Sequence, residues 1–332
     1  LLLCYSVYRL LHCRGVNWRI CNMKIKAIAL LSGGLDSILA AKIVKDQGID
    51  VFGICFKSYF FNPEKIARLQ AKEIAIPLKV IDISRAQFNI VKNPKYGWGK
   101  HINPCIDCHI LMLKKAKDLM QKENFNFIIT GEVAGQRPMS QRKTILKLIE
   151  KEAGLEGLIL RPLSAKLLEK TIPEKMGWIK RNKLFSISGR SRKKQLILAK
   201  KFKIKSYTTP AGGCLLTDPQ FSERLKNLIK KHPEAKTKKE VEILKLGRHF
   251  WENNTLIIIG RNKEENSNLI KNILKGDIIL EMRDIPGPTC LIRYLPENYN
   301  IQNKIIKKAK KLIEMYSKKL NKHTPVFYLN KI

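Results

Sequence analysis

The stretch AIALLSGGLDSILAAKIV at 27–44 constrains the fold more than any other part of this 332-residue chain. An apolar run ends in the pair Gly33–Gly34, and apolar residues at helical spacing follow it. This pattern predicts a buried strand, a tight turn and a helix. Paired glycines let the backbone bend sharply and approach a ligand, and the amides at the start of a helix attract anions. The stretch therefore predicts an α/β protein with a phosphate-binding turn.

Strand and helix patterns alternate through the first half of the chain. Apolar, strand-like runs cover 25–31, 49–56, 76–83 and 125–132. Helical patterns cover 36–47, 63–75, 106–123 and 140–153. An alternation of this kind favours a parallel sheet with helices on both faces.

The second half of the chain is more basic and less regular. Its helical patterns are a basic helix within 187–202, helices with a lysine-rich face within 220–247, and an amphipathic basic helix at 301–320. The composition changes near residue 250, and the segment 254–284 then reads as strand, helix and strand. We therefore expect a smaller second α/β domain in the C-terminal region.

The chain is strongly basic. Its 64 Lys and Arg residues against 28 Asp and Glu residues give a net charge of +36. Dense positive charge favours a polyanionic partner, while a lysine-rich composition without such a partner is the alternative. No apolar run of about 18 residues occurs, so we expect no membrane span. The cysteines are too sparse for a disulfide scaffold, and Cys55 and Cys290 fall in predicted strands, where we expect them to pack.

The turn SGGLDS at 32–37 lacks the lysine of the nucleotide loop G-x-x-x-x-G-K-[ST]. Ser32 and Ser37 supply hydroxyl donors. Asp36 alone would repel phosphate, so its place in the turn argues for a bridging Mg²⁺. A plain strand–helix turn without a ligand is the alternative.

Three cysteines carry a second signal. Cys105 and Cys108 form a CxxC at a predicted helix start, and Cys214 lies in a turn-rich loop. Two sulfur-delivering arrangements fit them: a [4Fe–4S] cluster on three thiolates with one open iron, or a persulfide that a second thiol resolves. A zinc site with His101 and His109, a redox pair and simple packing are the alternatives.

The turn at 32–37 resembles the SGGxDS pyrophosphate loop of the ATP pyrophosphatase superfamily, in which the loop also follows the first strand directly. The resemblance implies ATP binding by Ser32, Gly33, Gly34, Leu35, Asp36 and Ser37. It also implies cleavage between the α- and β-phosphates, so that a substrate oxygen takes AMP and pyrophosphate leaves. Adenylation of this kind turns a carbonyl oxygen into a good leaving group.

Two more motifs, TGEVAGQRPMSQRKT at 130–144 and LRPLSAK at 160–166, follow the CxxC in order. Over about 24–220 the chain resembles the catalytic domain of the tRNA 4-thiouridine synthetases, and NPCxxC is also similar to the tRNA 2-thiouridylases. The matching positions are Ser32–Ser37, Cys105, Cys108, Gly131, Glu132, Gly135, Gln136, Ser140, Gln141, Arg161–Leu163 and Lys166. The resemblance implies an adenine nucleotide α-hydrolase-like fold, ATP and Mg²⁺ as cofactors, and tRNA as the partner.

The same resemblance implies that a uridine carbonyl oxygen is adenylated and that sulfur then replaces AMP. The residues implied as catalytic are Cys105, Cys108, Cys214, Asp36 and Lys166. Those added to the turn for ATP binding are Gly131, Glu132 and Arg161. The metal centres expected are Mg²⁺ at Asp36 and a [4Fe–4S] cluster on the three cysteines. A cysteine desulfurase or free sulfide is the expected sulfur donor.

The segment 256–293 resembles the RNA-binding domain of NFACT proteins. Its matching positions are Gly260, Arg261, Asn262, Asn266, Leu269, Asp277, Pro286 and Gly287. Together with the positive charge, this resemblance implies RNA contacts by Arg261. The basic run SGRSRKKQ adds Arg190, Arg192, Lys193 and Lys194 to the expected RNA contacts.

We expect four parts in the chain. Residues 1–22 begin without methionine and directly precede Met23, so we expect an upstream leader that is not part of the native protein. An ATP-binding catalytic domain is expected over 23–205. A connector with the Cys-bearing loop and basic helices follows over 206–250, and an RNA-binding domain with a C-terminal helix covers 251–332.

These features together predict an ATP-dependent tRNA sulfurtransferase of the cytoplasm, with 4-thiouridine favoured over 2-thiouridine. One alternative is an amide-forming ligase of the same superfamily, which would need ammonia and would leave the CxxC unexplained. The other is a non-catalytic RNA-binding protein. The sequence leaves the oligomeric state open, a dimer included.

Overall fold

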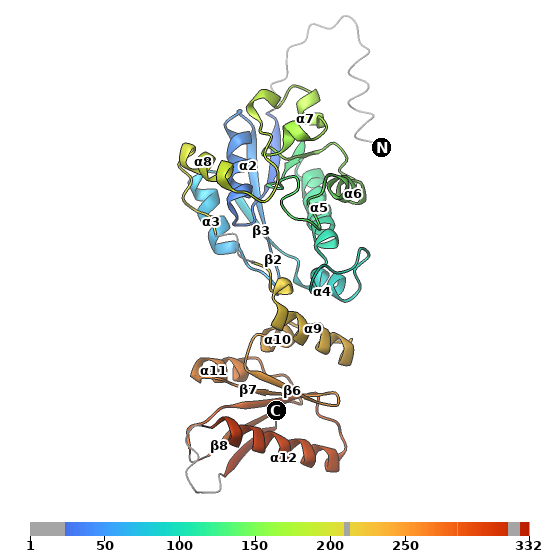
Figure 1. Cartoon of the computed structure of the whole chain (residues 1–332), viewed down its shortest axis with the longest axis vertical. Coiled ribbons are helices and arrows are strands. Elements are labelled where there is room, and N and C mark those ends of the chain that lie inside the picture. The colour runs from blue at the N-terminus through green and yellow to red at the C-terminus, as the bar shows by residue number, and fades with distance from the viewer. Residues whose placement is uncertain (1–23, 209–212, 284, 318–325, 332) are drawn as a thin grey trace, which may run out of the picture.

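The computed structural model describes residues 24–208, 213–283, 285–317 and 326–331. The leader expected at 1–22 lies outside them. In the described part, two sheets with helices packed on them lie at opposite ends of an elongated molecule, and short helices join them (Figure 1). No helix in these ranges has the length and apolar character needed to cross a membrane.

The first part of the chain alternates strand and helix, as the sequence predicts. Its strands are β1 (Lys26–Leu30), β2 (Asp50–Lys57), β3 (Leu78–Asp82), β4 (Phe127–Ile129) and β5 (Ile159–Leu160). Its α-helices are α2 (Leu35–Lys45), α3 (Glu64–Glu73), α4 (Ser84–Lys92), α5 (Cys105–Lys122), α6 (Lys143–Ala153), α7 (Ile172–Lys175) and α8 (Lys193–Lys201). Two 3₁₀ turns, η2 (Ala165–Leu167) and η3 (Arg181–Lys183), lie between α6 and α8.

The five strands of this sheet run parallel in the order β3-β2-β1-β4-β5. In the central strand, Ala27 is in register with Val51 of β2 on one side and with Phe127 of β4 on the other. The strand order reverses at β1, and ligands of open α/β sheets bind at the carboxyl ends of the strands at such a point. The parallel sheet is therefore confirmed, and the turn after β1 lies where a ligand is expected.

Alternate residues of β1 explain why helices cover both faces of the sheet. Ala27 and Ala29 belong to the apolar cluster formed with α2, α3 and α8. Ile28 points to the opposite face, into the cluster formed with α5 and α6. Because successive side chains of a strand point to opposite faces, a strand buried on both sides is apolar throughout.

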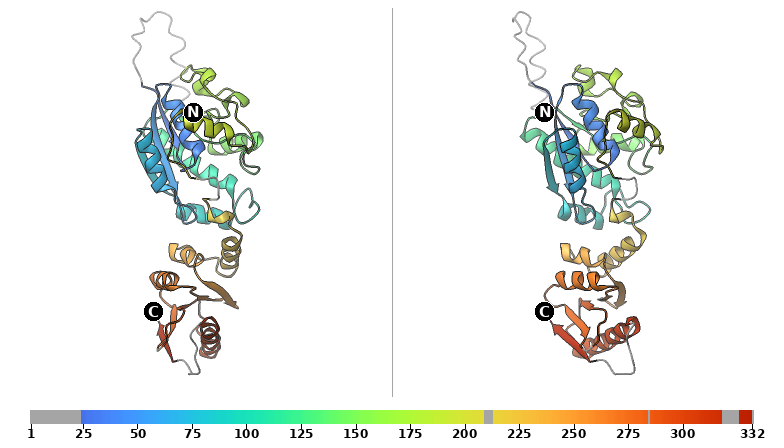
Figure 2. Two further views of the ribbon diagram at one scale, coloured as in Figure 1. Left: turned by 60° about the vertical axis from the view of Figure 1, so that its left-hand side comes forward. Right: turned by 90° about the vertical axis from the view of Figure 1, so that its left-hand side faces the viewer.

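A helical connector follows, formed by η4 (Leu215–Thr217), α9 (Pro219–Lys231) and α10 (Lys238–Ile243). Both views in Figure 2 show these helices between the two sheets. One apolar cluster joins Phe88 and Val91 of α4 to Leu225 and Leu228 of α9. The connector therefore packs directly on the first domain through α4, a helix that the sequence patterns do not predict.

The second sheet is antiparallel, with the strand order β10-β8-β9-β7-β6. Its strands are β6 (Arg248–Glu252), β7 (Thr255–Ile259), β8 (Ile278–Met282), β9 (Cys290–Arg293) and β10 (Phe327–Lys331), and its helices are α11 (Lys263–Lys271) and α12 (Tyr299–Tyr316). α12 covers one face of the sheet, and α10 and α11 contribute to the cluster on the other. The expected strand–helix–strand unit is β7–α11–β8, and Cys290 is buried in β9 as predicted.

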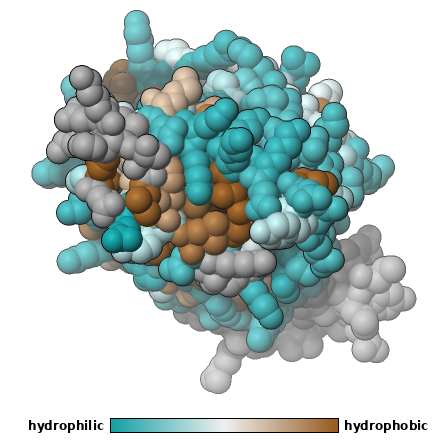
Figure 3. All heavy atoms as spheres, turned by 90° about the horizontal axis from the view of Figure 1, so that it is seen from below, coloured by the Kyte–Doolittle hydropathy of each residue, from teal (hydrophilic) through white to brown (hydrophobic). Residues whose placement is uncertain are grey.

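Viewed from the end of this domain, hydrophilic residues cover most of the surface around a smaller hydrophobic area (Figure 3).

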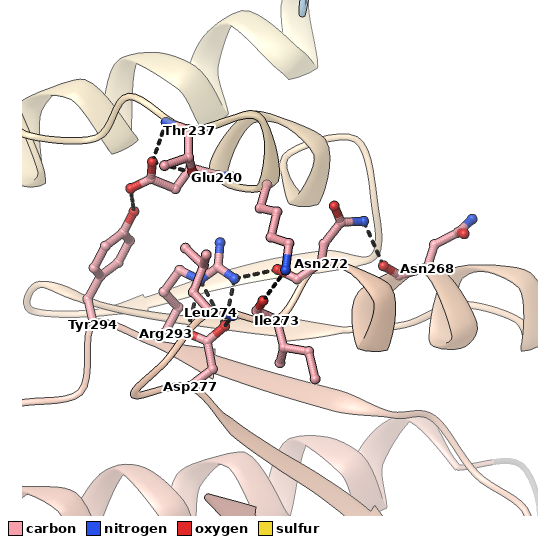
Figure 4. A network of polar contacts seen from close by, with 10 residues as sticks. Thr237, Glu240, Asn268, Asn272, Ile273, Leu274, Asp277, Arg293 and Tyr294 are labelled. Atoms are coloured by element: carbon pink, nitrogen blue, oxygen red, sulfur yellow. Dashed lines mark hydrogen bonds and ion pairs between the residues drawn. The ribbon is translucent and has the colours of Figure 1, made fainter. Parts of the chain in front are cut away.

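A polar network fixes the connector to the second sheet (Figure 4). The Tyr294 hydroxyl donates to Glu240 Oε1 of α10 at 2.8 Å. In the same view, the buried Arg293 guanidinium pairs with Asp277, with Nε 3.0 Å from Oδ1. Buried ions of opposite charge are tolerated when they are paired and hydrogen-bonded, so Asp277, a position of the NFACT-like motif, has a structural role here.

Candidate functional site

The turn after β1 has a shape that only glycine accommodates. Gly33 has φ +76°, in the left-handed region. A Cβ at this position would also clash with Cγ2 of Ile66 on α3. Gly34, with φ −82° and ψ 160°, is the N-cap residue of α2, and no side chain caps that helix end. The first amides of α2 are therefore left for a ligand, since a helix cannot satisfy its own first N–H groups.

The carbonyl groups of the turn are bonded to protein donors. Gly33 O accepts from the backbone N of Thr208 at 3.0 Å and from its Oγ1 at 3.2 Å. Gly34 O accepts from Gln70 Nε2 at 3.1 Å and from Ser37 Oγ at 2.9 Å. Because these acceptors are satisfied inside the protein, the turn presents its donors, which suits an anion.

Asp36 lies in the first turn of α2 with one carboxylate oxygen unsatisfied. Its Oδ2 accepts from Gln136 Nε2 at 3.1 Å. Its Oδ1 is buried and has no hydrogen-bond partner among the described residues. Burial raises the pKa of Asp36, and the positive charges of Arg192 and Arg137 partly oppose this. An unsatisfied carboxylate oxygen is the ligand type that Mg²⁺ prefers, so this position fits the expected cation.

The start of α8 adds further unsatisfied polar groups beside Asp36. The Gln195 side chain is fully buried and lies near enough to Asp36 to lower its pKa, although neither amide atom has a hydrogen bond of normal geometry in the described ranges. Arg192 Nε is also buried without a partner there. The positive charge of Arg192 acts on Asp36, and the expected RNA contact of Arg192 stays a prediction. Arg190, Lys193 and Lys194 are exposed and stay predicted RNA contacts.

Gly131 packs directly on the start of α2. A Cβ at this position would lie 2.5 Å from Ser37 N and 2.6 Å from the carbonyl carbon of Asp36. Both atoms belong to the backbone and cannot move aside as a side-chain end could. The segment after β4 therefore packs directly against the start of α2, and only glycine allows the two backbones to come this close.

A Gly131→Ala variant is expected to displace α2 or the segment after β4. We expect ATP-dependent pyrophosphate release to fall by about 10- to 100-fold, because small misplacements of reacting groups are costly. We also expect a loss of about 1–3 kcal/mol in the free energy of unfolding, measured with denaturant. The control is Gly213→Ala, since a Cβ there meets no described atom within 4 Å. Equal activity and stability of the two variants would contradict this close contact.

Glu132 and Arg161, expected to bind ATP, instead bond to each other. Arg161 Nε donates to Glu132 Oε2 at 2.9 Å, and Arg161 also pairs with Glu150. His109 Nδ1 lies 2.8 Å from Glu132 Oε1. Burial alone would raise the pKa of Glu132, but Arg161 and His109 outweigh it and lower the value to about 2. Both residues are buried, so we correct their expected role to a structural ion pair behind the site.

Lys166 does not reach the turn. Its Nζ donates to Asn182 O at 3.1 Å, and the residue lines a surface hollow with Asp46 and Gln47. Those two residues follow the carboxyl end of α2, whereas the glycine turn precedes its amino end. A helix of 11 residues is about 16 Å long. The expected contact of Lys166 with the phosphates is therefore corrected.

The structure brings together Cys105, Cys108 and Cys214, the three cysteines that the sequence associates with sulfur transfer. Cys105 is the first residue of α5 and is half-buried, Cys108 is buried, and Cys214 is half-buried. Burial raises the pKa of Cys108 to about 12, and the charges of Cys214 and Cys105 raise it further. Burial likewise raises the pKa of Cys214 to about 11, with Cys105 adding to it. Cys214 packs on the apolar cluster that contains Phe88 of α4, and the neighbouring Gln87 contacts Cys108 in the first turn of α5, so the three thiols lie around the same part of α4.

Two amide side chains hold the CxxC thiols. Gln87 Nε2 of α4 donates to Cys108 Sγ at 3.2 Å. Asn103 Nδ2 donates to Cys105 Sγ at 3.3 Å. In the ranges that the structure describes, no three His, Cys, Asp or Glu side chains are arranged to hold a metal ion. The described side chains therefore do not show the expected [4Fe–4S] cluster or a zinc site.

The segment that leads to Cys214 is tied to the phosphate turn. Gln70 Nε2 donates to Ser206 O at 3.0 Å as well as to Gly34 O. Thr208 pairs with Gly34 as an isolated parallel bridge. On the far side of Cys214, Leu215 N donates to Phe60 O at 2.9 Å, after β2. Gln70 and Thr208 are functional candidates that no sequence motif singles out.

Arg261 of the NFACT-like motif is exposed and forms an ion pair within its own helix start. Its Nε lies 2.9 Å from Glu265 Oε1, and both groups belong to the first part of α11. Asn262 caps the same helix by accepting from Glu265 N at 2.9 Å. The ion pair and the cap shape the start of α11, and the RNA contact of Arg261 stays a prediction.

The fold and the turn together define a class of protein. It is an α/β protein with a parallel sheet, in which the glycine turn after the central strand leaves helix amides and one carboxylate oxygen for a charged ligand. Residues 23–207 match the family described as "Thiamine biosynthesis protein (ThiI)", and the chain belongs to this family. Residues 247–330 match the "NFACT protein RNA binding domain". Both resemblances seen in the sequence are thus confirmed.

Curated relatives are similar over part of their length. A tRNA-specific 2-thiouridylase MnmA of Karelsulcia muelleri is 32% identical over 136 residues, covering 37% of this chain and 35% of that protein. A probable tRNA sulfurtransferase of Alkaliphilus metalliredigens is 31% identical over 148 residues, covering 42% of this chain and 36% of that protein. The chain thus spans about a third of the length of these relatives. Among solved structures, a 4-thiouridine synthetase–RNA complex with bound ATP is similar at 18% identity and a TM-score of 0.39, over 63% of this chain and 51% of that one.

Proposed function

We propose that this chain is an ATP-dependent tRNA sulfurtransferase that makes thiouridine, with 4-thiouridine favoured over 2-thiouridine. The observation that carries the proposal is the backbone bridge between Thr208 and the phosphate turn, which anchors the chain beside that turn six residues before Cys214 in the sequence. The names of the relatives, a 2-thiouridylase and a probable tRNA sulfurtransferase, support the same chemistry. A site that activates a carbonyl and delivers sulfur needs these two parts side by side.

The first step is adenylation. ATP lies with its phosphates on the turn at 32–37, where the amides of α2 hold the pyrophosphate group. A bound Mg²⁺ at Asp36 supplies positive charge to the phosphates. The uridine carbonyl oxygen attacks the α-phosphorus, the bond to the β-phosphate oxygen breaks, and pyrophosphate leaves. Gly131 packs against the start of α2 beside the reacting phosphates without adding a side chain.

The second step is sulfur transfer by the shared thiols. One of Cys105, Cys108 and Cys214 attacks the outer sulfur of a cysteine desulfurase persulfide and takes it up as its own persulfide, and the desulfurase cysteine leaves as a thiolate. Its terminal sulfur attacks the carbon that carries AMP, and AMP leaves. A second thiolate then attacks the inner sulfur, which releases thiouridine and leaves a disulfide for a cellular thiol to reduce. This route uses the thiols directly, and a [4Fe–4S] cluster on the same three cysteines is the alternative.

The parts of the chain divide this work. We propose that 23–205 binds ATP and activates uridine, that 206–250 brings Cys214 to the site, and that 251–332 binds tRNA. The exposed Arg190, Lys193 and Lys194 add phosphate contacts near the turn. Such a protein would work in the cytoplasm, where unmodified tRNA and a reducing thiol pool are both present.

Pyrophosphate release by the purified chain tests this proposal. We expect release only when ATP, Mg²⁺ and an unmodified tRNA transcript are present together. Release that needs no RNA but increases with ammonium would favour an amide-forming ligase. An absence of release, with tRNA still bound, would favour a non-catalytic RNA-binding protein. Either result would contradict the proposed function.

A further inference from the structure

A hollow of about 640 Å³ lies at the carboxyl ends of β2 and β3, apart from the phosphate turn. The lining residues used below are Tyr59, Asp82, Ser84, Arg85, Asn89 and Lys115. We propose that this hollow binds a nucleotide of the substrate RNA that neighbours the modified uridine, with Arg85 and Lys115 on its phosphate and Tyr59 against its base. This inference rests on the proposed function and assigns one site on the path of the RNA.

The position of α4 links the hollow to the thiols. Gln87 on its buried side donates to Cys108 Sγ at 3.2 Å. Arg85 and Asn89, four residues apart and therefore on one side of the helix, line the hollow. A helix with its side chains is about 10 Å across. A nucleotide in the hollow would therefore lie about one helix width from Cys108.

α4 also packs against the helical connector. Phe88 and Val91 pack in the apolar cluster of α9 and α10. Lys92 Nζ donates to Pro233 O, between those helices, at 2.6 Å. The hollow therefore lies beside the junction through which the C-terminal domain is attached. RNA that reaches from that domain to the thiols would pass α4.

The charges around the hollow favour an anion. The Arg85 side chain is exposed and makes no hydrogen bond or ion pair with the described residues. Lys115 has only an exposed partner, Asp118, at 3.8 Å. Such exposed pairs contribute little, so both cations are available to a phosphate.

Asp82, the acidic residue that lines the hollow, already accepts a hydrogen bond from the protein. Asp82 Oδ1 accepts from Ser84 N at 2.8 Å, which holds the turn into α4. The positive charges of Lys57 and of Lys238 on α10 also act on this carboxylate. Asp82 stays ionised, but the two cations Arg85 and Lys115 outnumber its single negative charge, so the lining of the hollow is positive on balance.

The ring of Tyr59 is positioned so that a base can stack on it. Tyr59 is half-buried and packs edge-on against Phe88, with ring centroids 6.3 Å apart, and against Phe60 at 6.4 Å. These contacts fix the ring without covering it fully. Base stacking on aromatic side chains, with basic groups along the backbone, is the usual way in which single-stranded RNA is bound. A protein in the hollow would instead have to offer acidic groups to Arg85 and Lys115, and it would have no base to stack on Tyr59.

The test compares tRNA binding by the full chain and by an Arg85→Gln/Lys115→Gln variant. We expect the variant to bind an unmodified tRNA transcript about 10-fold more weakly near 0.15 M salt, and the slope of log Kd against log salt to be shallower by about 1 to 2. ATP binding without RNA reports on the fold and is expected to stay unchanged. The control is Lys122→Gln, an exposed lysine two turns further along α5, which should bind tRNA like the unaltered chain.

The outcomes separate this subsite from the function. Equal affinity and salt slope for the double variant and the control would overturn the subsite while thiouridine formation still supports the function. Weakened tRNA binding by the double variant, with no thiouridine formed by the unaltered chain, would support the subsite and contradict the proposed function. If the double variant binds tRNA normally but accepts sulfur more slowly from a cysteine desulfurase, the hollow holds a protein and the proposal is wrong.

Discussion

An Asp36→Asn variant is expected to release pyrophosphate about 100- to 1,000-fold more slowly than the unaltered chain, at saturating tRNA and ATP. The change keeps the size of the side chain and its contact with Gln136 Nε2. It removes the charge of the buried Oδ1, which has no partner among the described residues. A neutral amide is a much poorer ligand for Mg²⁺ than a carboxylate.

The matched control for this variant is Asp46→Asn. Asp46 follows the other end of α2 and pairs with Lys42, 2.5 Å away, at the surface. Losing an exposed pair of this kind costs less than about 1 kcal/mol and should leave pyrophosphate release unchanged. If Asp36→Asn retains the rate of the control at high Mg²⁺, the carboxylate does not serve the phosphates.

A Cys214→Ala variant is expected to lose thiouridine formation while it still releases pyrophosphate. Adenylation needs the turn and Asp36, whereas replacement of AMP needs the thiols that share a region with Cys214. The variant should therefore separate the two steps. Thiouridine is measured by mass spectrometry of nucleosides from the treated tRNA, and pyrophosphate is measured in the same reaction.

Cys290→Ala is the control for the loss of a thiol. Cys290 is fully buried in β9 of the second sheet, so its truncation leaves a small cavity and should lower stability by about 1 kcal/mol. Thiouridine formation should persist in this variant. Full thiouridine content after Cys214→Ala would show that this thiol takes no part in sulfur transfer.

Local patterns were enough to predict four of the five strands of the first sheet, whereas β5, only two residues long, was not predicted. β1 and α2 can be predicted because a continuous apolar run, a glycine pair and a following apolar segment at helical spacing are all signals within neighbouring residues. α4 was not predicted, although it contacts Cys108, the connector and the hollow. Its nine residues lie between a strand and a glycine-broken loop, and a helix this short gains its stability from packing.

The site was predicted where its residues belong to one continuous motif. The turn at 32–37 and the CxxC are of this kind, and their residues lie where the sequence suggested. Gln70 could not be found, because its role depends on the Ser206 and Gly34 carbonyls, which come together only in the folded chain. Arg161 was misassigned for a related reason. A buried cation requires partners, and its partners Glu132 and Glu150 are distant enough in sequence to be missed.

The most direct test of the proposed function is mass spectrometry of nucleosides from a tRNA transcript incubated with the full chain, ATP, Mg²⁺ and a sulfur donor. We predict a uridine in which one oxygen is replaced by sulfur, formed together with AMP and pyrophosphate, and absent when ATP is omitted. Unchanged nucleosides, in reactions where the chain binds both tRNA and ATP, would contradict the account.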